Sequence, residues 1–187
     1  MKRIVVIGPE STGKTTLAEH LSKHFSTVLV TEFARDFLTY LDRPYEEEDL
    51  LTIAKGQQDQ EQSARIKVRL KANAKFSSRF KTKATPSDVV ICDTDLRVIR
   101  IWSQRKYGMC DPWISKQIDE NKADLYLLCK PDIPWVADDL RENPNDLEEL
   151  YQCYKYDLER DGQKFVEISG DGKARIEMAV RAINRVF

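Results

Sequence analysis

The sequence predicts an α/β protein in which helices cover both faces of a central parallel sheet, giving three layers. Five short runs rich in β-branched and apolar residues recur along the 187 residues, and helical patterns separate them. This alternation is typical of a parallel sheet. The five runs, each expected to form a strand, are RIVVI (3–7), TVLVT (27–31), DVVICD (88–93), DLYLLC (124–129) and KFVEIS (164–169).

A glycine-rich loop follows the first expected strand directly. Residues 8–16 read GPESTGKTT and fit the phosphate-binding P-loop pattern, and a helical pattern with Leu17, Leu21 and Phe25 follows. An ordinary glycine turn is the alternative, but the order of strand, loop and helix favours a P-loop NTPase fold. In that interpretation the loop binds the phosphates of ATP through backbone N–H groups, and Thr15 contributes a hydroxyl to Mg²⁺. The expected ATP-binding residues are Gly8, Glu10, Ser11, Thr12, Gly13, Lys14, Thr15 and Thr16.

Length and composition indicate one domain, residues 1–187, with a full hydrophobic core. The formal net charge of -1 argues against a nucleic-acid binder, and no apolar run approaches the length of a membrane span. The first residues predict a strand rather than a signal peptide. The four cysteines are scattered without a C-x-x-C pair, which is typical of reduced thiols in the cytoplasm.

Carboxylates follow the third expected strand at the edge where parallel sheets bind ligands. Asp93 ends the strand, and a carboxylate there is expected to hold Mg²⁺ through its water shell. Asp95, two residues later, is a candidate substrate contact. Its alternative role is to cap the helix that begins with LRVIRIW.

Glu32 and Arg35 follow the second expected strand. If a helix begins here, their spacing places both on one face. Glu32 then binds a sugar hydroxyl or accepts its proton. The alternative, weighed equally, is a surface ion pair at the start of a helix.

A proline-bracketed segment, about residues 131–149, predicts a lid. Prolines at 131, 134 and 144 prevent one continuous helix across it. A mobile segment with an arginine suits phosphoryl transfer, because closure excludes water and the guanidinium meets charge on the phosphate. The alternative is an inert connection with a buried tryptophan. The candidate residues of this lid are Trp135, Asp138, Asp139 and Arg141.

Two further segments have open interpretations. Trp102 and Tyr107 lie on an expected helix, where they either stack on a flat ring or belong to the core. A long helical region from about 46 to 82 has a basic second half over 65–83. Ile66, Leu70 and Ala74 are expected to form its buried stripe. A solvated basic face is favoured over a surface for an acidic partner or nucleic acid.

Several motifs together resemble the ribosylnicotinamide kinase domain of the bacterial NadR proteins. They are GPESTGKTTL, EFARDFL, CDTDL, PDIPWVADDLRE and ISGDGKARIEMA, which extend over nearly the whole chain. The resemblance implies a small P-loop kinase that transfers phosphate from ATP to the 5′-hydroxyl of nicotinamide riboside. It implies that Lys14 and Thr15 hold ATP and Mg²⁺ and that Asp93 is the metal-linked carboxylate. It also implies that Glu32, Arg35 and Asp138 surround the riboside, that Arg141 belongs to the lid, and that the segment after Ser169 passes the adenine.

The sequence departs from the family pattern in two respects. It begins at the kinase strand, so the DNA-binding and adenylyltransferase domains of multidomain members are not expected here. Thr31 stands where some members have an aromatic residue, and Asp139 where glycine is frequent. The stacking surface is then expected from Trp102 or Trp135, or the substrate differs. Two alternatives therefore stay open: a kinase for another nucleoside, and a non-catalytic ATP-binding switch.

Overall fold

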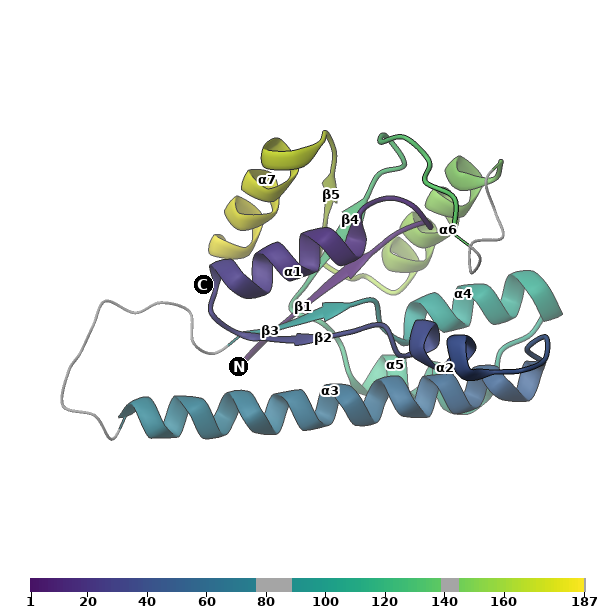
Figure 1. The fold of residues 1–187 in the computed structure, drawn as a ribbon, viewed down its shortest axis with the longest axis horizontal. Coiled ribbons are helices and arrows are strands. Elements are labelled where there is room, and N and C mark those ends of the chain that lie inside the picture. Colours follow the sequence, from purple (N-terminus) through teal and green to yellow (C-terminus); the bar gives the residue numbers. More distant parts are fainter. Residues whose placement is uncertain (77–88, 139–144, 187) are drawn as a thin grey trace.

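Five parallel strands form one sheet in the order β2-β3-β1-β4-β5 (Figure 1). The computed structural model describes residues 1–76, 89–138 and 145–186. Every neighbouring pair in this sheet is parallel, and all five expected runs form strands. The α/β P-loop fold predicted from the sequence is confirmed. The strands are β1 (Lys2–Ile7), β2 (Val28–Val30), β3 (Val89–Asp93), β4 (Leu125–Cys129) and β5 (Phe165–Ile168).

Alternating side chains of β1 supply the cores on both faces of the sheet. Ile4 and Val6 pack in one cluster with residues of α1 (Lys14–His24) and α7 (Gly172–Asn184). Val5 and Ile7 pack in a second cluster on the opposite face. Successive side chains of a strand point to opposite faces, so a strand that is buried on both faces is apolar throughout.

The second face is covered by α3 (Glu47–Phe76), α4 (Leu96–Tyr107) and α6 (Leu147–Arg160), each of which contributes side chains to that cluster. A third apolar cluster joins α3 and α4 to α2 (Phe33–Tyr40) and α5 (Pro112–Glu120). In Figure 1, α3 runs beneath the sheet and α2, α5 and the end of α4 gather at one end of it. This arrangement places α2, α4 and α6 around the carboxyl ends of the strands.

The buried stripe of α3 differs from the expected one. Ile66 and Leu70 are exposed by 52% and 63% of their surface. The buried positions of α3 are instead 49, 50, 53, 54, 57, 61, 64 and 68, and three of them are the polar residues Asp49, Gln57 and Glu61. The spacing of apolar residues alone does not identify this stripe, because its polar members are buried through contacts with specific partners. The side chain of Ala74 and the stretch 77–83 lie outside the described part.

The predicted lid is described at its two ends. Residues 131–138 form neither helix nor strand, and α6 begins at Leu147. Asp139, Arg141 and Pro144 lie outside the described residues. Among the helices that the structure describes, none is long and apolar enough to cross a bilayer.

Candidate active site

The two P-loop glycines adopt backbone conformations that are unfavourable for a residue with a side chain. Gly8 has φ of +141°, and a Cβ atom built there would lie 2.6 Å from the carbonyl oxygen of Cys129. Gly13 has φ of +72° and is the N-cap residue of α1. The loop therefore packs its first glycine directly on the end of β4 and uses the second to begin the helix.

The interior of the loop is held by its own polar groups. Thr12 is fully buried, and its hydroxyl donates to the carbonyl of Pro9 at 2.8 Å. The ammonium of Lys14 donates to the same carbonyl at 2.6 Å. Lys14 is thus positioned at the loop beside the start of α1, where N–H groups and the helix dipole favour an anion.

A cavity of about 450 Å³ opens beside this loop. Most of the residues expected from the sequence line it together, from the P-loop, α2 and α4. These residues are Gly8, Glu10, Ser11, Thr12, Gly13, Lys14, Thr15, Thr16, Glu32, Arg35 and Trp102.

Sequence reasoning missed the remaining wall of this cavity. One face of α4 lines it with Val98, Ile101, Trp102 and Arg105, at the i, i+3, i+4, i+7 spacing of a single helix face. That periodicity, read outward from Trp102, was the signal available. The other lining residues not expected from the sequence are Ala34, Leu38, Lys106, Leu150 and Tyr154.

Asp93 lies at the end of β3 and is 2% exposed. Its Oδ1 atom is buried without a hydrogen-bond partner among the described residues. Burial raises the pKa of Asp93, while a hydrogen bond to Thr15 and the charge of Lys14 oppose that rise. An orphaned carboxylate oxygen beside the Thr15 hydroxyl offers the hard oxygen ligands that Mg²⁺ prefers. These residues therefore fit the expected metal.

Asp95 is placed differently from the expected substrate contact. Its side chain accepts from the backbone N–H of Arg97 at 3.0 Å, so it caps α4 as the alternative interpretation predicted. It also accepts from the Tyr126 hydroxyl at 2.9 Å and pairs with Arg3 at 3.2 Å. Asp95 does not line the P-loop cavity but a second cavity with Arg3 and Glu61. Its carboxylate is occupied by protein partners, which corrects the expectation that it meets substrate.

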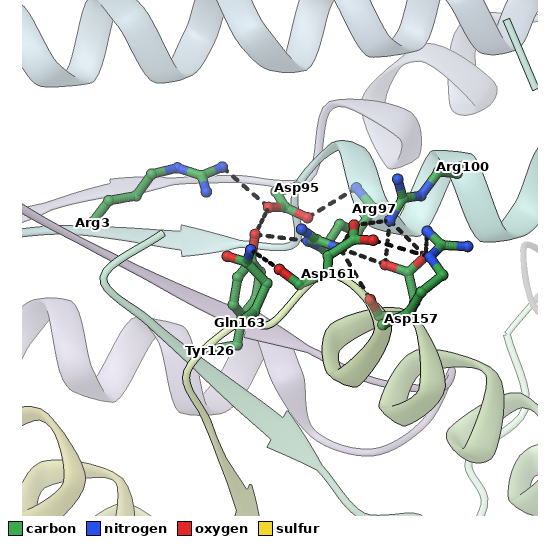
Figure 2. A network of polar contacts seen from close by, with 9 residues as sticks. Arg3, Asp95, Arg97, Arg100, Tyr126, Asp157, Asp161 and Gln163 are labelled. Carbon is green, nitrogen blue, oxygen red and sulfur yellow. Dashed lines mark hydrogen bonds and ion pairs between the residues drawn. The ribbon is translucent and has the colours of Figure 1, made fainter. Parts of the chain in front are cut away.

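The contacts of Asp95 continue into a buried ionic network (Figure 2). Arg97 is fully buried and donates to Tyr126 at 3.0 Å and to Asp157 at 2.6 Å. Both Arg97 and Arg100 also reach Asp161, at 2.7 and 2.6 Å. The network thus joins α4 to the C-terminal part of α6, and both helices line the P-loop cavity through other residues.

Glu32 begins α2 without capping it. Its side chain makes no capping hydrogen bond. The amide of the buried Gln57, from α3, caps the helix instead by accepting from the N–H of Phe33 at 2.8 Å. The same amide donates to the carbonyl of Thr31 at 3.2 Å. Gln57 thereby holds the backbone on both sides of Glu32, and the Glu32 carboxylate lines the cavity.

The environment of Glu32 makes it a stronger base than an ordinary carboxylate. Burial raises the pKa of Glu32, the nearby charge of Lys14 lowers it, and the charge of Asp93 adds to the rise. Glu32 lines the cavity, whereas Asp93 lies behind it at the end of β3 and is not among the lining residues. A carboxylate with a perturbed pKa that faces a cavity is typical of functional sites.

The described start of the lid lies against the P-loop and α2. The N–H of Val136 donates to the Ser11 hydroxyl at 2.8 Å. Arg35 donates to Asp138 at 2.7 Å, which joins α2 to this segment. The proposed riboside contacts Arg35 and Asp138 are therefore brought together, while the lid arginine Arg141 lies outside the described chain.

The aromatic wall of the cavity is fixed by a neighbour. Trp102 donates its indole N–H to the Tyr45 hydroxyl at 2.7 Å, and the two rings meet edge to face at 4.7 Å. The Lys106 ammonium lies 3.4 Å from the centre of the Tyr45 ring. Trp102 therefore packs against a core cluster, as the core interpretation expects, and also borders the cavity. Its stacking on a flat ring stays a prediction. Trp135 is half-buried and is not among the lining residues.

Two curated relatives share the name trifunctional NAD biosynthesis/regulator protein NadR. The protein of Salmonella typhimurium is 25% identical over 147 residues, covering 75% of this chain and 31% of the relative. That of Escherichia coli is 24% identical over 176 residues, covering 90% of this chain and 38% of the relative. The chain thus spans about a third of the length of these relatives. The similarity to NadR proteins that the motifs predict is confirmed.

Solved structures show the same fold. A crystal structure of NadR protein in complex with NR has a TM-score of 0.70 at 21% identity, covering 99% of this chain and 51% of that chain. NadR protein in complex with NAD and AMP-PNP has a TM-score of 0.72 at 21% identity, covering 99% of this chain and 49% of that chain. Thymidylate kinase from Ehrlichia chaffeensis has a TM-score of 0.62 at 13% identity and is covered over 98% of its length by 97% of this chain.

A family model described as AAA domain matches residues 3–175. That range begins in β1, contains the P-loop, Asp93 and the lid segment, and ends in the first turns of α7. It includes all of the sheet except Lys2 at the start of β1, and every residue that lines the P-loop cavity. The chain belongs to the AAA domain family.

Proposed function

We propose that this protein is an ATP-dependent kinase that phosphorylates the 5′-hydroxyl of nicotinamide riboside to give nicotinamide mononucleotide. One observation carries the proposal: a phosphate-binding loop, the half-buried carboxylate of Glu32 at the start of α2 and the Trp102 side chain line the same cavity. A small-molecule kinase needs those three features to hold its donor, its reacting hydroxyl and its acceptor ring. The NadR relatives and the NadR complex with NR support this choice of acceptor.

On the donor side, the P-loop backbone and Lys14 hold the phosphates of ATP. The Thr15 hydroxyl and Asp93 hold Mg²⁺, which neutralises charge on the transferring phosphate when bound. Arg141, from the lid, adds a guanidinium to that phosphate when the lid closes. The NadR complex with NAD and AMP-PNP supports a nucleotide donor in this fold.

On the acceptor side, Glu32 binds the 5′-hydroxyl and accepts its proton. A carboxylate with a raised pKa is better matched to a proton transfer near neutral pH than an ordinary one. The ring of the acceptor lies along α4 against Trp102, whose orientation Tyr45 fixes. Arg35 and Asp138 hold the ribose from the side of the lid. Arg105 and Lys106 line the part of the wall two turns beyond Val98.

A kinase for another nucleoside is the second candidate, because thymidylate kinase and a deoxyadenosine kinase share the fold. A coupled assay of ADP release over a panel of nucleosides tests both, with Lys14→Ala as the inactive control. We expect turnover that nicotinamide riboside stimulates most. If a different nucleoside stimulates turnover most, that nucleoside is the acceptor. If no nucleoside stimulates turnover, the result favours an ATP-binding switch.

We also propose a cytoplasmic location, which the use of ATP and the four scattered free cysteines support. Its partners are small molecules. Fractionation of cells that produce the tagged protein tests this location.

A further inference from the structure

Arg175 is a buried arginine in the first turns of α7, and it makes contacts that neither the P-loop motif nor the proposed mechanism uses. It is 5% exposed. Nη1 donates to the carbonyl of Thr12 at 2.6 Å, Nε to that of Gly170 at 2.8 Å, and Nη2 to that of Lys130 at 3.2 Å. One guanidinium therefore joins the middle of the P-loop, the end of β4 and the β5–α7 turn.

Asp132 completes this arrangement. It forms an ion pair with Nη2 of Arg175, and its other oxygen accepts from the N–H of Gly170 at 2.7 Å. The carboxylate balances a charge that would be costly to bury alone. It also holds the β5–α7 turn from a second direction.

The contact with Thr12 bears directly on phosphate binding. Phosphate is bound by N–H groups of the loop, whose directions depend on how each peptide plane is held. Thr12 lies between Ser11 and Gly13, and Arg175 holds its carbonyl from the side of α7. A small rotation of that peptide plane redirects the N–H groups that must converge on phosphate. A planar fork with several donors fixes such a plane better than a single ammonium.

We propose that Arg175, with Asp132, is the positioning residue of the nucleotide side of the site. It holds the P-loop in its phosphate-binding shape and fixes the β5–α7 turn beside it. Thr12 is the cavity-lining residue that Arg175 contacts in the described part of the chain. Its other partners are Lys130, Asp132 and Gly170, none of which lines the cavity. Its loss is therefore expected to weaken binding of the nucleotide and to leave binding of the acceptor unchanged.

The test measures binding of Mg²⁺ with the ATP analogue AMP-PNP by calorimetry, without any acceptor. The variants are Arg175→Lys, which keeps the charge but loses the fork, Arg175→Met, which loses both, and Asp132→Asn. Arg181→Gln is the matched control, because Arg181 lies on the same helix with an exposed side chain and pairs with Glu177 alone in the described part. We expect the Kd for AMP-PNP to rise about tenfold in Arg175→Lys and Asp132→Asn and about a hundredfold in Arg175→Met, while Arg181→Gln matches the parent.

Steady-state kinetics then separate positioning from general loss of structure. We expect KM for ATP to rise in the Arg175 variants, while KM for the acceptor stays within about twofold of the parent value. KM for ATP in Arg175→Lys should lie between the values of the parent and of Arg175→Met. An equal rise in KM for ATP and in KM for the acceptor would overturn the proposal, and so would unchanged AMP-PNP binding in folded Arg175→Lys and Asp132→Asn. If Arg175→Met does not fold, the two milder variants carry the test. Since AMP-PNP binding needs no acceptor, an incorrect acceptor in the proposed function leaves this result intact.

Discussion

Asp93 and Asp95 stand two residues apart at the end of one strand, both almost completely buried, yet their surroundings are opposite. Asp95 accepts from Arg97, Tyr126 and Arg3 and belongs to a network of arginines and carboxylates. Asp93 has a buried oxygen without a described partner and a raised pKa. Buried carboxylates are normally satisfied by donors or cations. A buried carboxylate oxygen that lacks a donor from the described protein is suited to bind a cation that comes from solution.

The comparison predicts opposite effects for the two asparagine substitutions. Asp93→Asn should lower kcat by about a hundredfold or more, because several kcal/mol of charge stabilisation depend on the metal. Its free energy of unfolding should stay the same or rise, since a poorly solvated charge is removed. Turnover assays and urea unfolding of the purified variant measure both. Unchanged kcat would remove Asp93 from the catalytic site.

Asp95→Asn should act on stability instead. It removes the weaker of the two carboxylate partners of Arg3, which keeps Glu61, and a hydrogen bond to a charged group contributes about 1.5–3 kcal/mol. We expect that loss in the free energy of unfolding, with kcat of the folded enzyme within a few-fold of the parent. If the Asp95→Asn variant is folded and stable but has lost turnover, Asp95 contacts the substrate instead.

Gln57→Leu tests whether the α2 cap positions Glu32. The amide of Gln57 holds the residues on both sides of Glu32, and an N-cap contributes about 0.5–2 kcal/mol. We expect kcat/KM for the acceptor to fall about tenfold, because a displacement well below 1 Å affects a reacting group measurably. Gln58→Leu is the control, since that neighbour pairs with Gln117 of α5. Equal activity of the two variants would show that the cap has no role in positioning.

The raised pKa values of Asp93 and Glu32 predict a smaller effect on stability. Both groups bind protons more tightly in the folded protein than in the unfolded chain. Their contribution is therefore complete below the ordinary carboxylate pKa and is lost as pH rises through the raised values. Urea unfolding across the range from about pH 4 to about pH 8 should show this loss in the parent and a flatter profile in Asp93→Asn combined with Glu32→Gln. If the free energy of unfolding depends on pH in the same way in the parent and in the double variant, the raised pKa values of Asp93 and Glu32 are contradicted.

Those parts of the fold that depend on local pattern could be predicted from the sequence. The five strands are apolar runs, and the P-loop lies within nine consecutive residues, so neither needs knowledge of distant partners. The same holds for the cavity residues next to a strand end, such as Glu32 and Arg35. Each follows from its position along the chain and from the parallel arrangement of the strands.

The remaining features depend on contacts between distant segments. The role of Asp95 is set by Arg3 and Tyr126, and the buried stripe of α3 includes Gln57 and Glu61 because α2 and β1 provide their partners. No periodic apolar pattern marks such positions. Arg175 was missed for the same reason, since nothing in its local sequence indicates that it reaches Thr12 across the fold.

The central claim is that Asp93 serves the metal and Asp95 serves the fold. The most direct test is the stabilisation that Mg²⁺ adds to nucleotide binding. Melting temperatures are measured with AMP-PNP alone and with AMP-PNP and Mg²⁺, for the parent, Asp93→Asn and Asp95→Asn. Ligands that bind only the folded state raise its melting temperature. We predict that Mg²⁺ adds the same increment in the parent and in Asp95→Asn, although the latter melts lower, and adds none in Asp93→Asn. A full Mg²⁺ increment in Asp93→Asn would contradict the account.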